Sequence, residues 1–438
     1  MKLQAGFARV DITPPFGTLL DGYFFERPAD GVLDPLQATA IAFDDGEKKA
    51  VLINLDDLGT AQPLMMRFRQ AVAERVGTVP EGVFIECTHT HLGPRTMDNL
   101  GYSFNHEHVE WMVVRIADAA ELAMQDLKPV TYMGYTRGIV EGVSFVRRYR
   151  MKDGSIETNP GRLNPDIVEP VSPPDTQSQL LVIEREGAKE IGIVNFQVHP
   201  DVIGGSKISA DYPGFVRRTY EKLVENSLCV YINGAQGDSN HIDTTIPKPI
   251  NSGYKWARYM GVKIAASVAS KRDLLEELPI GKINFGQKNI FVTLNKGRPE
   301  QMEEAARLYK VFLEEGRDAA KELAKTMKTV SGYVEAKRIM GLEPMPPEKE
   351  LYLTALSVGE WVVAGFPGEP FTDIGRAVKA ESKFTLTMPS CCSNGYEGYF
   401  PMSSCFDEGG YEVSTARFIK GTAEKVIEGS VELINSLK

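Results

Sequence analysis

Short apolar runs alternate with helical patterns in the first third of the chain. Val51–Leu55 and Val83–Cys87 are largely apolar runs of strand length, which predicts two buried β-strands. Between them, Leu64–Val76 has apolar positions at helical spacing, and Val109–Leu127 carries a second, longer amphipathic pattern. Strands that alternate with helices predict an α/β fold of mixed β-sheets layered with helices.

The central part of the chain predicts a β-hairpin, another strand and a helix. Gln179–Glu184 and Glu190–Gln197 flank a short polar turn, which is typical of a hairpin. Leu228–Ile232 is apolar enough for a buried strand, and Lys255–Lys271 has the spacing of an amphipathic helix. The α/β pattern therefore continues past the middle of the chain.

Residues 299–343 differ in composition from the rest of the chain. They are rich in Glu, Lys, Ala, Arg and Leu, which indicates one long helix or a helical hairpin, with breaks near Gly316 and Gly332. We interpret this segment as a helical insertion within a single domain that spans residues 1–438. Its ordinary role would be packing, and the alternative is a lid or an oligomer contact.

Strand patterns return in the last quarter of the chain. They lie at Tyr352–Ser357, Trp361–Phe366 and Phe384–Met388. A loop region rich in Gly, Tyr and Ser follows, and Ala416–Lys438 ends the sequence with an amphipathic helical pattern.

Composition narrows the class of protein. The 438 residues are 42% hydrophobic and 25% charged, as in an ordinary globular protein. A net charge of −10 and the lack of a basic stripe argue against binding to nucleic acid. The sequence has no apolar stretch long enough for a membrane span and no signal-peptide pattern, so we expect a soluble, cytoplasmic protein without a stable membrane anchor.

The cysteines suggest neither disulfides nor a metal knot. Their number is five, which is odd, and a chain of this size needs no covalent staples, so we expect reduced thiols. Cys391, Cys392 and Cys405 lie close together in the sequence, but they lack the CxxC spacing of a zinc knot.

Two of the six histidines stand one residue apart, directly after a predicted strand. They are His89 and His91, in Thr88-His-Thr-His-Leu-Gly-Pro94. If the strand continues through them, both side chains point to the same side of the sheet. This arrangement suits a metal ligand with a neighbouring acid–base group, although a surface pair of polar residues is the alternative.

Two further candidates follow apolar strands. His199 ends the run Ile193–Val198 and precedes a proline, where α/β sheets commonly place their sites. Glu369 lies in a Gly/Pro turn after Trp361–Phe366, and burying a glutamate there is costly unless it is paired or bound to metal. Two histidines with one glutamate form a usual catalytic zinc set that leaves one position for water.

The sequence resembles the catalytic domain of the neutral ceramidase family, the neutral or alkaline non-lysosomal ceramidases. The matching motifs occur in the family's order along most of the chain. They are Gly6–Gly17, Thr88–His91 with Gly93 and Pro94, Val198–Pro200, Ala210–Gly214, Asn233–Asp238, Pro367–Pro370 and Asn394–Tyr399.

The resemblance implies a zinc site with four protein ligands. The ligands in the matching motifs are His89, His199, Glu369 and Tyr399. A second family tyrosine faces the substrate twelve residues after the ligand tyrosine, and Tyr411 stands at that spacing here.

The resemblance also implies two further catalytic residues. His91 matches the family's histidine near the metal-bound water. The family's site arginine matches Arg147 best, but Val146 replaces the asparagine that usually precedes it, so Arg148 remains an alternative.

Departures from the family pattern concern the substrate. Residues 237–241, Gly-Asp-Ser-Asn-His, are shorter than the family's loop and lack its proline, and the sequence contains no match for the family's C-terminal β-sandwich domain. We therefore predict a zinc-dependent hydrolase that cleaves a linear amide bond in a small or lipid-like N-acyl substrate other than ceramide. The alternatives are a zinc esterase or lactonase, or a non-catalytic zinc- or ligand-binding relative; any of them is compatible with a homo-oligomer.

Several polar residues are expected to have ordinary roles. His106 and His108 are predicted to be polar surface at a loop or helix start, while His241 could touch substrate. Asp56 and Asp57 follow a predicted strand, and we expect them to form a turn or a helix N-cap.

Overall fold

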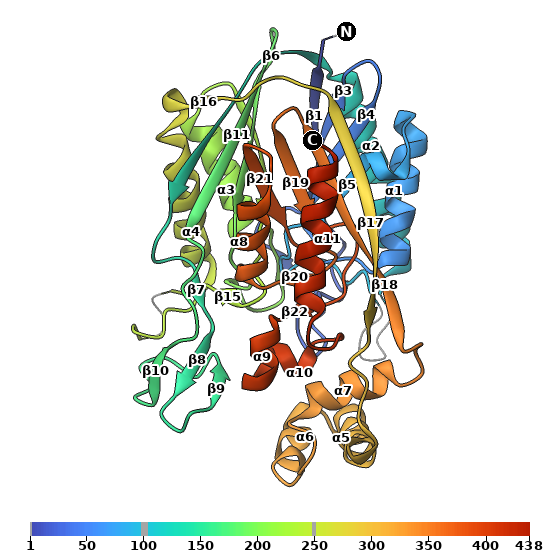
Figure 1. Cartoon of the computed structure of the whole chain (residues 1–438), viewed down its shortest axis with the longest axis vertical. Coiled ribbons are helices and arrows are strands. Elements are labelled where there is room, and N and C mark those ends of the chain that lie inside the picture. Colours follow the sequence, from blue (N-terminus) through green and yellow to red (C-terminus); the bar gives the residue numbers. More distant parts are fainter. Residues whose placement is uncertain (1, 98–103, 248–250) are drawn as a thin grey trace.

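A twisted mixed sheet forms the centre of the molecule (Figure 1). The computed structural model describes residues 2–97, 104–247 and 251–438. Within them, this sheet has nine strands in the order β14-β12-β11-β6-β1-β3-β4-β5, with β16 paired to β6. The strands are β1 (Gln4–Asp11), β3 (Gln37–Asp44), β4 (Lys49–Leu55), β5 (Val83–Cys87), β6 (Lys128–Ile139), β11 (Gln177–Arg185), β12 (Glu190–Phe196), β14 (Ser227–Asn233) and β16 (Glu276–Glu277).

A second mixed sheet lies against the first. It has the order β17-β18-β19-β21, with antiparallel pairs except for the parallel pair β19–β21. Its strands are β17 (Ile283–Thr293), β18 (Glu348–Val358), β19 (Trp361–Gly365) and β21 (Leu386–Ser390). The predicted strand at Phe384–Met388 is thus real but begins two residues later.

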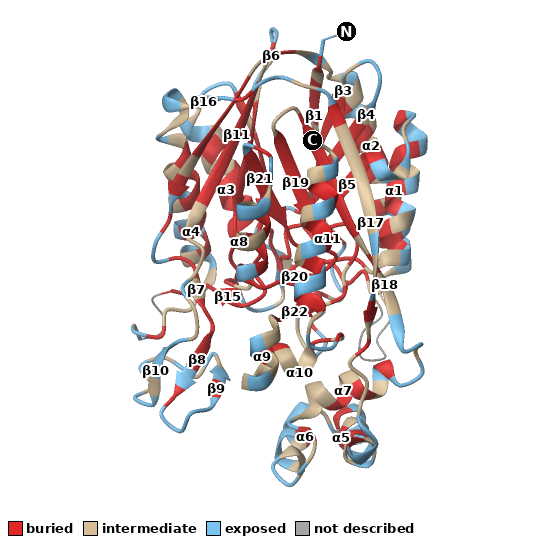
Figure 2. Cartoon of the chain, viewed as in Figure 1, coloured by how far each residue is buried: buried red, intermediate tan, exposed pale blue. Residues whose placement is uncertain are grey.

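Helices cover the outer faces of the two sheets, which gives four layers. One apolar core joins the central sheet to α1 (Gln62–Val76), α2 (His106–Gln125), α3 (Asp211–Leu223) and α4 (Gly253–Ala269). A second core lies between the sheets, and a third joins the second sheet to α8 (Thr372–Glu381) and α11 (Thr422–Ser436). Figure 2 shows this burial as red strands inside helices with exposed outer faces. The predicted α/β fold of layered mixed sheets is confirmed.

The alternation of side chains along β19 shows how one strand serves two cores. Trp361 and Val363 belong to the core between the sheets, whereas Val362 and Ala364 belong to the core under α8 and α11. Successive residues of a strand point to opposite faces, so an apolar run with no polar position is what a strand covered on both sides requires.

The two edges of the central sheet approach each other. β5 and β14 lie at opposite ends of the strand order, yet the Asn54 side chain on β4 donates a hydrogen bond to the backbone oxygen of Tyr231 on β14, at 2.8 Å. The Asn233 side chain at the end of β14 also donates to the Thr88 oxygen just after β5, at 3.1 Å. The loops after both edges therefore meet in one place.

The segment rich in helix formers folds as three helices, with breaks at both predicted positions, Gly316 and Gly332. They are α5 (Met302–Glu315), α6 (Arg317–Ala324) and α7 (Tyr333–Leu342). Gly316 breaks the first two with a φ of 88°, a conformation that glycine adopts without strain. The helices project from one end of the molecule, beside α10 (Tyr411–Thr415) (Figure 1). That this segment is an insertion into a single domain remains a prediction.

Shorter elements complete the fold. Helix α9 (Ser403–Glu408) precedes α10, and a three-stranded sheet of β8 (Arg148–Met151), β9 (Ile156–Thr158) and β10 (Ile167–Pro170) stands on the other side of them (Figure 1). The two-stranded pairs are β2 (Gly31–Val32) with β13 (Lys207–Ile208), β7 (Phe145–Val146) with β15 (Ser239–Asn240), and β20 (Glu369–Pro370) with β22 (Tyr399–Phe400).

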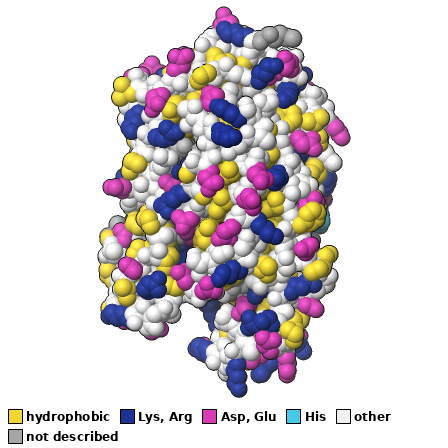
Figure 3. Space-filling model, viewed as in Figure 1, with side chains coloured by type: hydrophobic (Ala, Val, Ile, Leu, Met, Phe, Trp, Pro, Cys, Tyr) yellow, Lys and Arg dark blue, Asp and Glu magenta, His cyan; other side chains and the backbone are white. Residues whose placement is uncertain are grey.

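The surface fits the predicted charge pattern. Acidic and basic side chains are interspersed over the face drawn in Figure 3, without a continuous basic stripe. In the part of the chain that the structure describes, no helix combines the length and hydrophobicity needed to cross a bilayer.

Candidate metal centre

His89 stands in a loop just past the end of β5. The strand stops at Cys87 and His89 has a φ of 71°, so the strand does not continue through the two histidines, and strand alternation is not what brings their rings together. The His89 backbone N–H donates to the Asp57 oxygen, at 2.9 Å. The ring Nδ1 lies 2.7 Å from the Leu58 oxygen, which can only accept a hydrogen bond. Nδ1 therefore carries the proton, and the lone pair of Nε2 faces His199 and Glu369.

His199 comes from the other edge of the central sheet. It follows β12, and the preceding Val198 oxygen accepts a hydrogen bond from the Tyr212 hydroxyl at 2.6 Å, which fixes the loop. Its Nε2 lies 3.3 Å from Nε2 of His89. The His91 backbone N–H donates to the Pro200 oxygen at 3.3 Å, so the two histidine loops are also joined directly.

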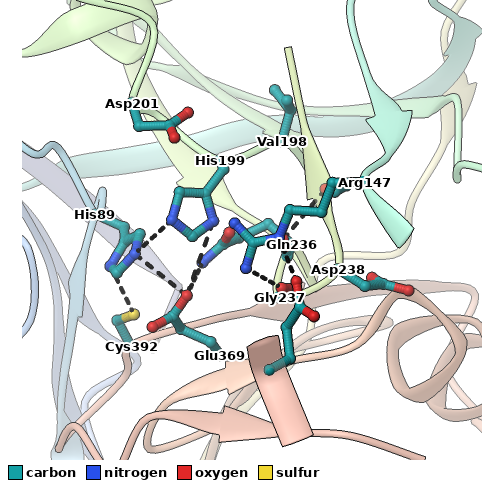
Figure 4. Close-up of polar contacts among 12 residues, drawn as sticks. His89, Arg147, Val198, His199, Asp201, Gln236, Gly237, Asp238, Glu369 and Cys392 are labelled. Carbon is teal, nitrogen blue, oxygen red and sulfur yellow. Dashed lines mark hydrogen bonds and ion pairs between the residues drawn. The ribbon is translucent and has the colours of Figure 1, made fainter. Parts of the chain in front are cut away.

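Glu369 reaches the two imidazoles from the loop after β19. Its Oε2 lies 3.3 Å from His89 Nε2 and 3.8 Å from His199 Nδ1. Figure 4 shows the carboxylate and both rings pointing toward one another. Glu369 is paired with Tyr399 across the parallel ladder of β20 and β22. The strands come this close because residue 368 is glycine: a Cβ there would lie 2.4 Å from the Gly398 oxygen.

The charges at this centre are strongly coupled. Burial opposes ionisation of Glu369, but the neighbouring imidazoles, His89 first, outweigh it and hold the carboxyl pKa far below its ordinary value. Burial also opposes protonation of His89, and the Glu369 carboxylate overcomes this and raises the His89 pKa. Burial lowers the pKa of His199 to about 3, helped by the positive charge of Arg147. The centre thus combines an ionised carboxylate with a neutral His199.

His91 lies against both ligand-like histidines. Its ring meets those of His89 and His199 edge to face, with centroids 5.1 and 5.0 Å apart. One nitrogen from each of the three rings can be chosen so that all lie within 4.8 Å of one another, a buried group that could hold a metal ion. Neither ring nitrogen of His91 has a hydrogen-bond partner among the described residues. Burial holds the His91 pKa well below its ordinary value.

The packing around His91 explains one glycine. Gly22 has a φ of 96°, and a Cβ there would lie 2.5 Å from Nδ1 of His91. The Tyr23 ring packs edge to face on the imidazole, with centroids 5.6 Å apart. Arg27 donates to the His91 backbone oxygen at 2.6 Å. The imidazole is therefore held in place by contacts instead of by hydrogen bonds of its own.

The spacing of the donor atoms fits a zinc ion. Two ligands about 2.0–2.1 Å from a tetrahedral zinc lie roughly 3.3–3.4 Å from each other. The distances from His89 Nε2 to His199 Nε2 and to Glu369 Oε2 are both 3.3 Å. Nδ1 of His199 is a buried nitrogen without a hydrogen-bond partner in the described structure, so the His199 ring is free to turn a nitrogen toward such an ion. The residues present therefore fit a bound divalent metal.

Arg147, and not Arg148, lies next to this centre. The Arg147 guanidinium lies 5.3 Å from the centroid of the Tyr399 ring. It donates to the buried Glu412 carboxylate at 2.7 Å. It also donates to the Gly237 oxygen at 2.7 Å (Figure 4). Arg148 turns the other way and pairs with Glu408 at 2.9 Å.

The two tyrosines that the sequence singled out lie side by side. The rings of Tyr399 and Tyr411 are 5.8 Å apart in an edge-to-face arrangement. Burial raises the pKa of both phenols, so both keep their protons at neutral pH. Tyr411 also meets the ring of Phe24 at 6.5 Å, and Phe24 in turn meets Tyr333 of α7 at 5.9 Å. Phe24 thus lies between Tyr411 and an aromatic ring of the helical segment.

The sequence interpretation missed several residues of this region. Tyr396 donates a hydrogen bond to Oε1 of Glu369 at 2.5 Å, and Cys392 Sγ lies 3.4 Å from His89 Nδ1. Asp201, two residues after His199, pairs with buried His241 at 3.1 Å. Tyr396 lies inside the family motif Asn394–Tyr399, and this is the one sequence feature that could have indicated its role. No local sequence pattern indicated a role for Cys392 or Asp201.

Two expectations about ordinary polar residues are wrong in part. His106 is exposed at the start of α2 as expected, but His108 is buried instead of lying on the surface. Asp56 and Asp57 are buried in the bend that follows β4, as the turn interpretation expects, but they cap no helix, because α1 begins after Ala61 without a side-chain cap. Asp56 forms a two-pronged ion pair with Arg217, at 2.6 and 2.8 Å.

The cysteines behave as expected. All five are buried free thiols, and no disulfide links them. Burial raises the pKa of Cys391 and Cys392, which keeps both thiols protonated and makes them poor metal ligands.

The chain has the fold of neutral ceramidase. The crystal structure of neutral ceramidase from Pseudomonas aeruginosa matches the whole chain with a TM-score of 0.77 at 18% sequence identity, and the match covers 74% of that protein's chain. A structure of a ceramidase complexed with C2 matches the whole chain with a TM-score of 0.75 at 17% identity, covering 75% of that chain. No protein-family model matches the chain, and no curated protein matches it by sequence. The resemblance drawn from the motifs is thus confirmed at the level of the fold.

Proposed function

We propose that the chain is a zinc-dependent hydrolase that cleaves a linear amide bond in an N-acyl substrate. The observation that carries this proposal is the convergence of His89, His199 and Glu369, whose donor atoms have the spacing of zinc ligands. These residues come from three loops that are far apart in the sequence, and a purely structural zinc site would have no need of the arginine and second tyrosine beside it.

The proposed ligands are His89 Nε2, an imidazole nitrogen of His199, Oε2 of Glu369 and the Tyr399 phenol. The first three are supported by the distances between them. Tyr399 is supported by its pairing with Glu369 across the β20–β22 ladder and by the family resemblance. Bound zinc would supply a Lewis acid and a water whose pKa falls toward about 7.

His91 is the proposed acid–base group. It is neutral, buried and next to both histidine ligands, and its ring nitrogens have no competing partner among the described residues. A neutral imidazole can accept a proton from the attacking water at a ring nitrogen and then deliver it to the leaving amine. Gly22 and Tyr23 pack against the ring and restrict its rotation.

Arg147 and Tyr411 are the proposed donors to the oxyanion. Attack on an amide carbonyl places negative charge on its oxygen, and donors fixed in advance stabilise that charge. The Arg147 guanidinium is fixed by Glu412 and the Gly237 oxygen, and the Tyr411 phenol keeps its proton because burial raises its pKa. Both groups lie beside the Tyr399 ring.

The proposed substrate is a small or lipid-like N-acyl compound other than ceramide. The names of the two similar structures support an N-acyl bond. The departure at residues 237–241 supports a different substrate, because that loop here brings the His241 imidazole to 3.1 Å from the Asp201 carboxylate, close to His199. An ionised carboxylate with a polar partner is poorly suited to a long alkyl chain, since apolar contacts could not replace the water lost from it.

The test is to measure bound zinc and hydrolysis together. The purified protein is assayed for metal content, then with a panel of N-acyl amino compounds and the matching esters. About one zinc per chain with faster cleavage of amides supports the proposal, and faster cleavage of esters would make the protein an esterase or lactonase. Bound zinc without turnover of any compound would indicate a non-catalytic relative.

A further inference from the structure

Tyr396 contacts two of the proposed zinc ligands at once. Its hydroxyl donates to Oε1 of Glu369 at 2.5 Å, one of the shortest tyrosine–carboxylate contacts in the described structure. Its ring lies nearly parallel to the imidazole of His89, with centroids 6.0 Å apart and an interplanar angle of 27°. No other described tyrosine touches both residues.

The two oxygens of Glu369 consequently have different surroundings. Oε1 accepts the hydrogen bond from Tyr396, while Oε2 faces His89 and His199 at 3.3 and 3.8 Å. Gln236 lies near Oε2 as well, but its amide nitrogen is 3.4 Å away and forms at best a weak bond. Tyr396 is thus the hydrogen-bond partner of Oε1. This bond fixes the rotation of the Glu369 carboxylate about the Cγ–Cδ bond.

The fold makes room for the Tyr396 ring in this position. Gly59 packs against the Tyr396 ring. It lies two residues after Asp57, whose backbone oxygen accepts the hydrogen bond from the His89 N–H. A Cβ at residue 59 would come within 2.6 Å of Tyr396 Cδ2. The φ of Gly59 is not positive, so the backbone itself would accept alanine, and the glycine is explained by its contact with the ring.

We propose that Tyr396 is a positioning residue for the metal centre, which holds Glu369 so that only Oε2 is presented to the ion and supports the His89 ring from the side. This inference rests on the proposed zinc site. Partners of this kind orient the ligands and keep the carboxylate ionised, and losing one typically weakens metal binding about 10–100-fold. The position of Tyr396, three residues before the proposed ligand Tyr399, also keeps both tyrosines on one short loop.

Zinc affinity of the metal-free protein tests the proposal. Tyr396→Phe keeps the ring and removes the hydroxyl, and we expect its Kd for zinc, measured by competition with a chromophoric chelator, to rise about 10–100-fold. The matched control is Tyr135→Phe, because the Tyr135 hydroxyl also donates to a glutamate, Glu276, at 2.7 Å, but far from the site on β6. The control should bind zinc like the wild type.

A second variant covers the case in which Tyr396→Phe does not fold. Gly59→Ala keeps the hydroxyl but pushes the ring away from its place, so it should also weaken zinc binding. A wild-type Kd in Tyr396→Phe overturns the inference, as does a weakening that the Tyr135→Phe control shares. If the wild-type protein itself binds no zinc, the proposed function fails instead, so the two failures can be told apart.

Discussion

The pattern His-X-His occurs twice in this chain, and the two pairs of histidines have different structural surroundings. In the first, His89 and His91 end up with their rings 5.1 Å apart, next to His199 and Glu369. In the second, His106 and His108 begin helix α2, where one ring is exposed and the other is buried beside Trp111, with centroids 5.4 Å apart.

The difference lies in the backbone and in distant residues, not in the spacing. Residues two apart in a helix point about 200° apart, so His106 and His108 diverge. At the first copy the positive φ of His89 turns the chain after β5 and lets both rings face the same centre. A carboxylate and a third imidazole then arrive from other loops, whereas no such group meets the second pair among the described residues. A metal site therefore needs this convergence, and an i, i+2 spacing alone does not predict it.

Removing one histidine from each copy should give the largest contrast. His89→Ala should abolish stoichiometric zinc binding and all hydrolysis, because it removes a proposed ligand whose Nε2 lies 3.3 Å from Oε2 of Glu369. His106→Ala, at an exposed position, should keep wild-type zinc content and activity. Metal analysis of the two purified variants is the measurement. Full zinc occupancy in His89→Ala would show that the first copy is not the metal site.

Substitution of His91, the second histidine of the first pair, should lower the rate of hydrolysis without releasing zinc. His91→Ala should lower kcat by about 10²–10⁴-fold, the usual contribution of an acid–base group, while zinc stays bound. The alternative is that His91 is itself a metal ligand, since it belongs to the group of three histidines that could hold a metal. Loss of zinc from His91→Ala would make His91 a ligand and remove it from the acid–base role.

A smaller effect on kcat is expected from Tyr411, beside Tyr399. Tyr411→Phe should lower kcat by about 10²–10³-fold, as for loss of one oxyanion donor, with zinc content unchanged. Tyr333→Phe on α7, a ring near Phe24 that makes no contact with Tyr399, is the matched control and should keep its kcat. A wild-type rate for Tyr411→Phe would take that phenol out of the mechanism.

In the second pair, the burial of His108 should make the free energy of unfolding modestly dependent on pH. Burial lowers the pKa of His108 to about 4. Between pH 6.5 and 4 the unfolded chain therefore binds a proton at His108 that the folded chain does not, so the free energy of unfolding falls as the pH falls through this window.

His108→Gln should remove part of this acid sensitivity. Urea unfolding at pH 7 and pH 4.5 measures it: the difference in unfolding free energy between the two pH values should be smaller in His108→Gln than in the wild type. His106→Gln, at the exposed ring of the same pair, is the control. An unchanged difference in His108→Gln would mean that His108 carries its proton in the fold as easily as in the unfolded chain.

Local patterns were sufficient for the elements that carry the site. Val83–Cys87 and the hairpin at Gln179–Gln197 were predicted because apolar runs of strand length end in polar turns, and β5, β11 and β12 follow them closely. His199 and Glu369 could be singled out because each follows such a run, where the chain leaves a sheet. The roles of Tyr399 and Tyr411 came only from the resemblance to a family.

Long-range pairing could not be predicted from local patterns. Asp56 looked like a turn residue, but its partner Arg217 lies 161 positions away in the sequence. The bond from Tyr396 to Glu369 depends on two loops meeting beside the curled edges of the central sheet. By contrast, the breaks between α5, α6 and α7 were predicted locally, because Gly316 and Gly332 interrupt the run of helix formers.

The central claim is that His89, His199 and Glu369 hold one zinc ion. A crystal grown with zinc and measured at the zinc absorption edge tests it directly through the anomalous difference map. We expect one strong peak about 2.0–2.2 Å from an imidazole nitrogen of His89, an imidazole nitrogen of His199 and a carboxylate oxygen of Glu369. No peak between these three side chains, or a peak that Glu369 does not touch, would contradict the account.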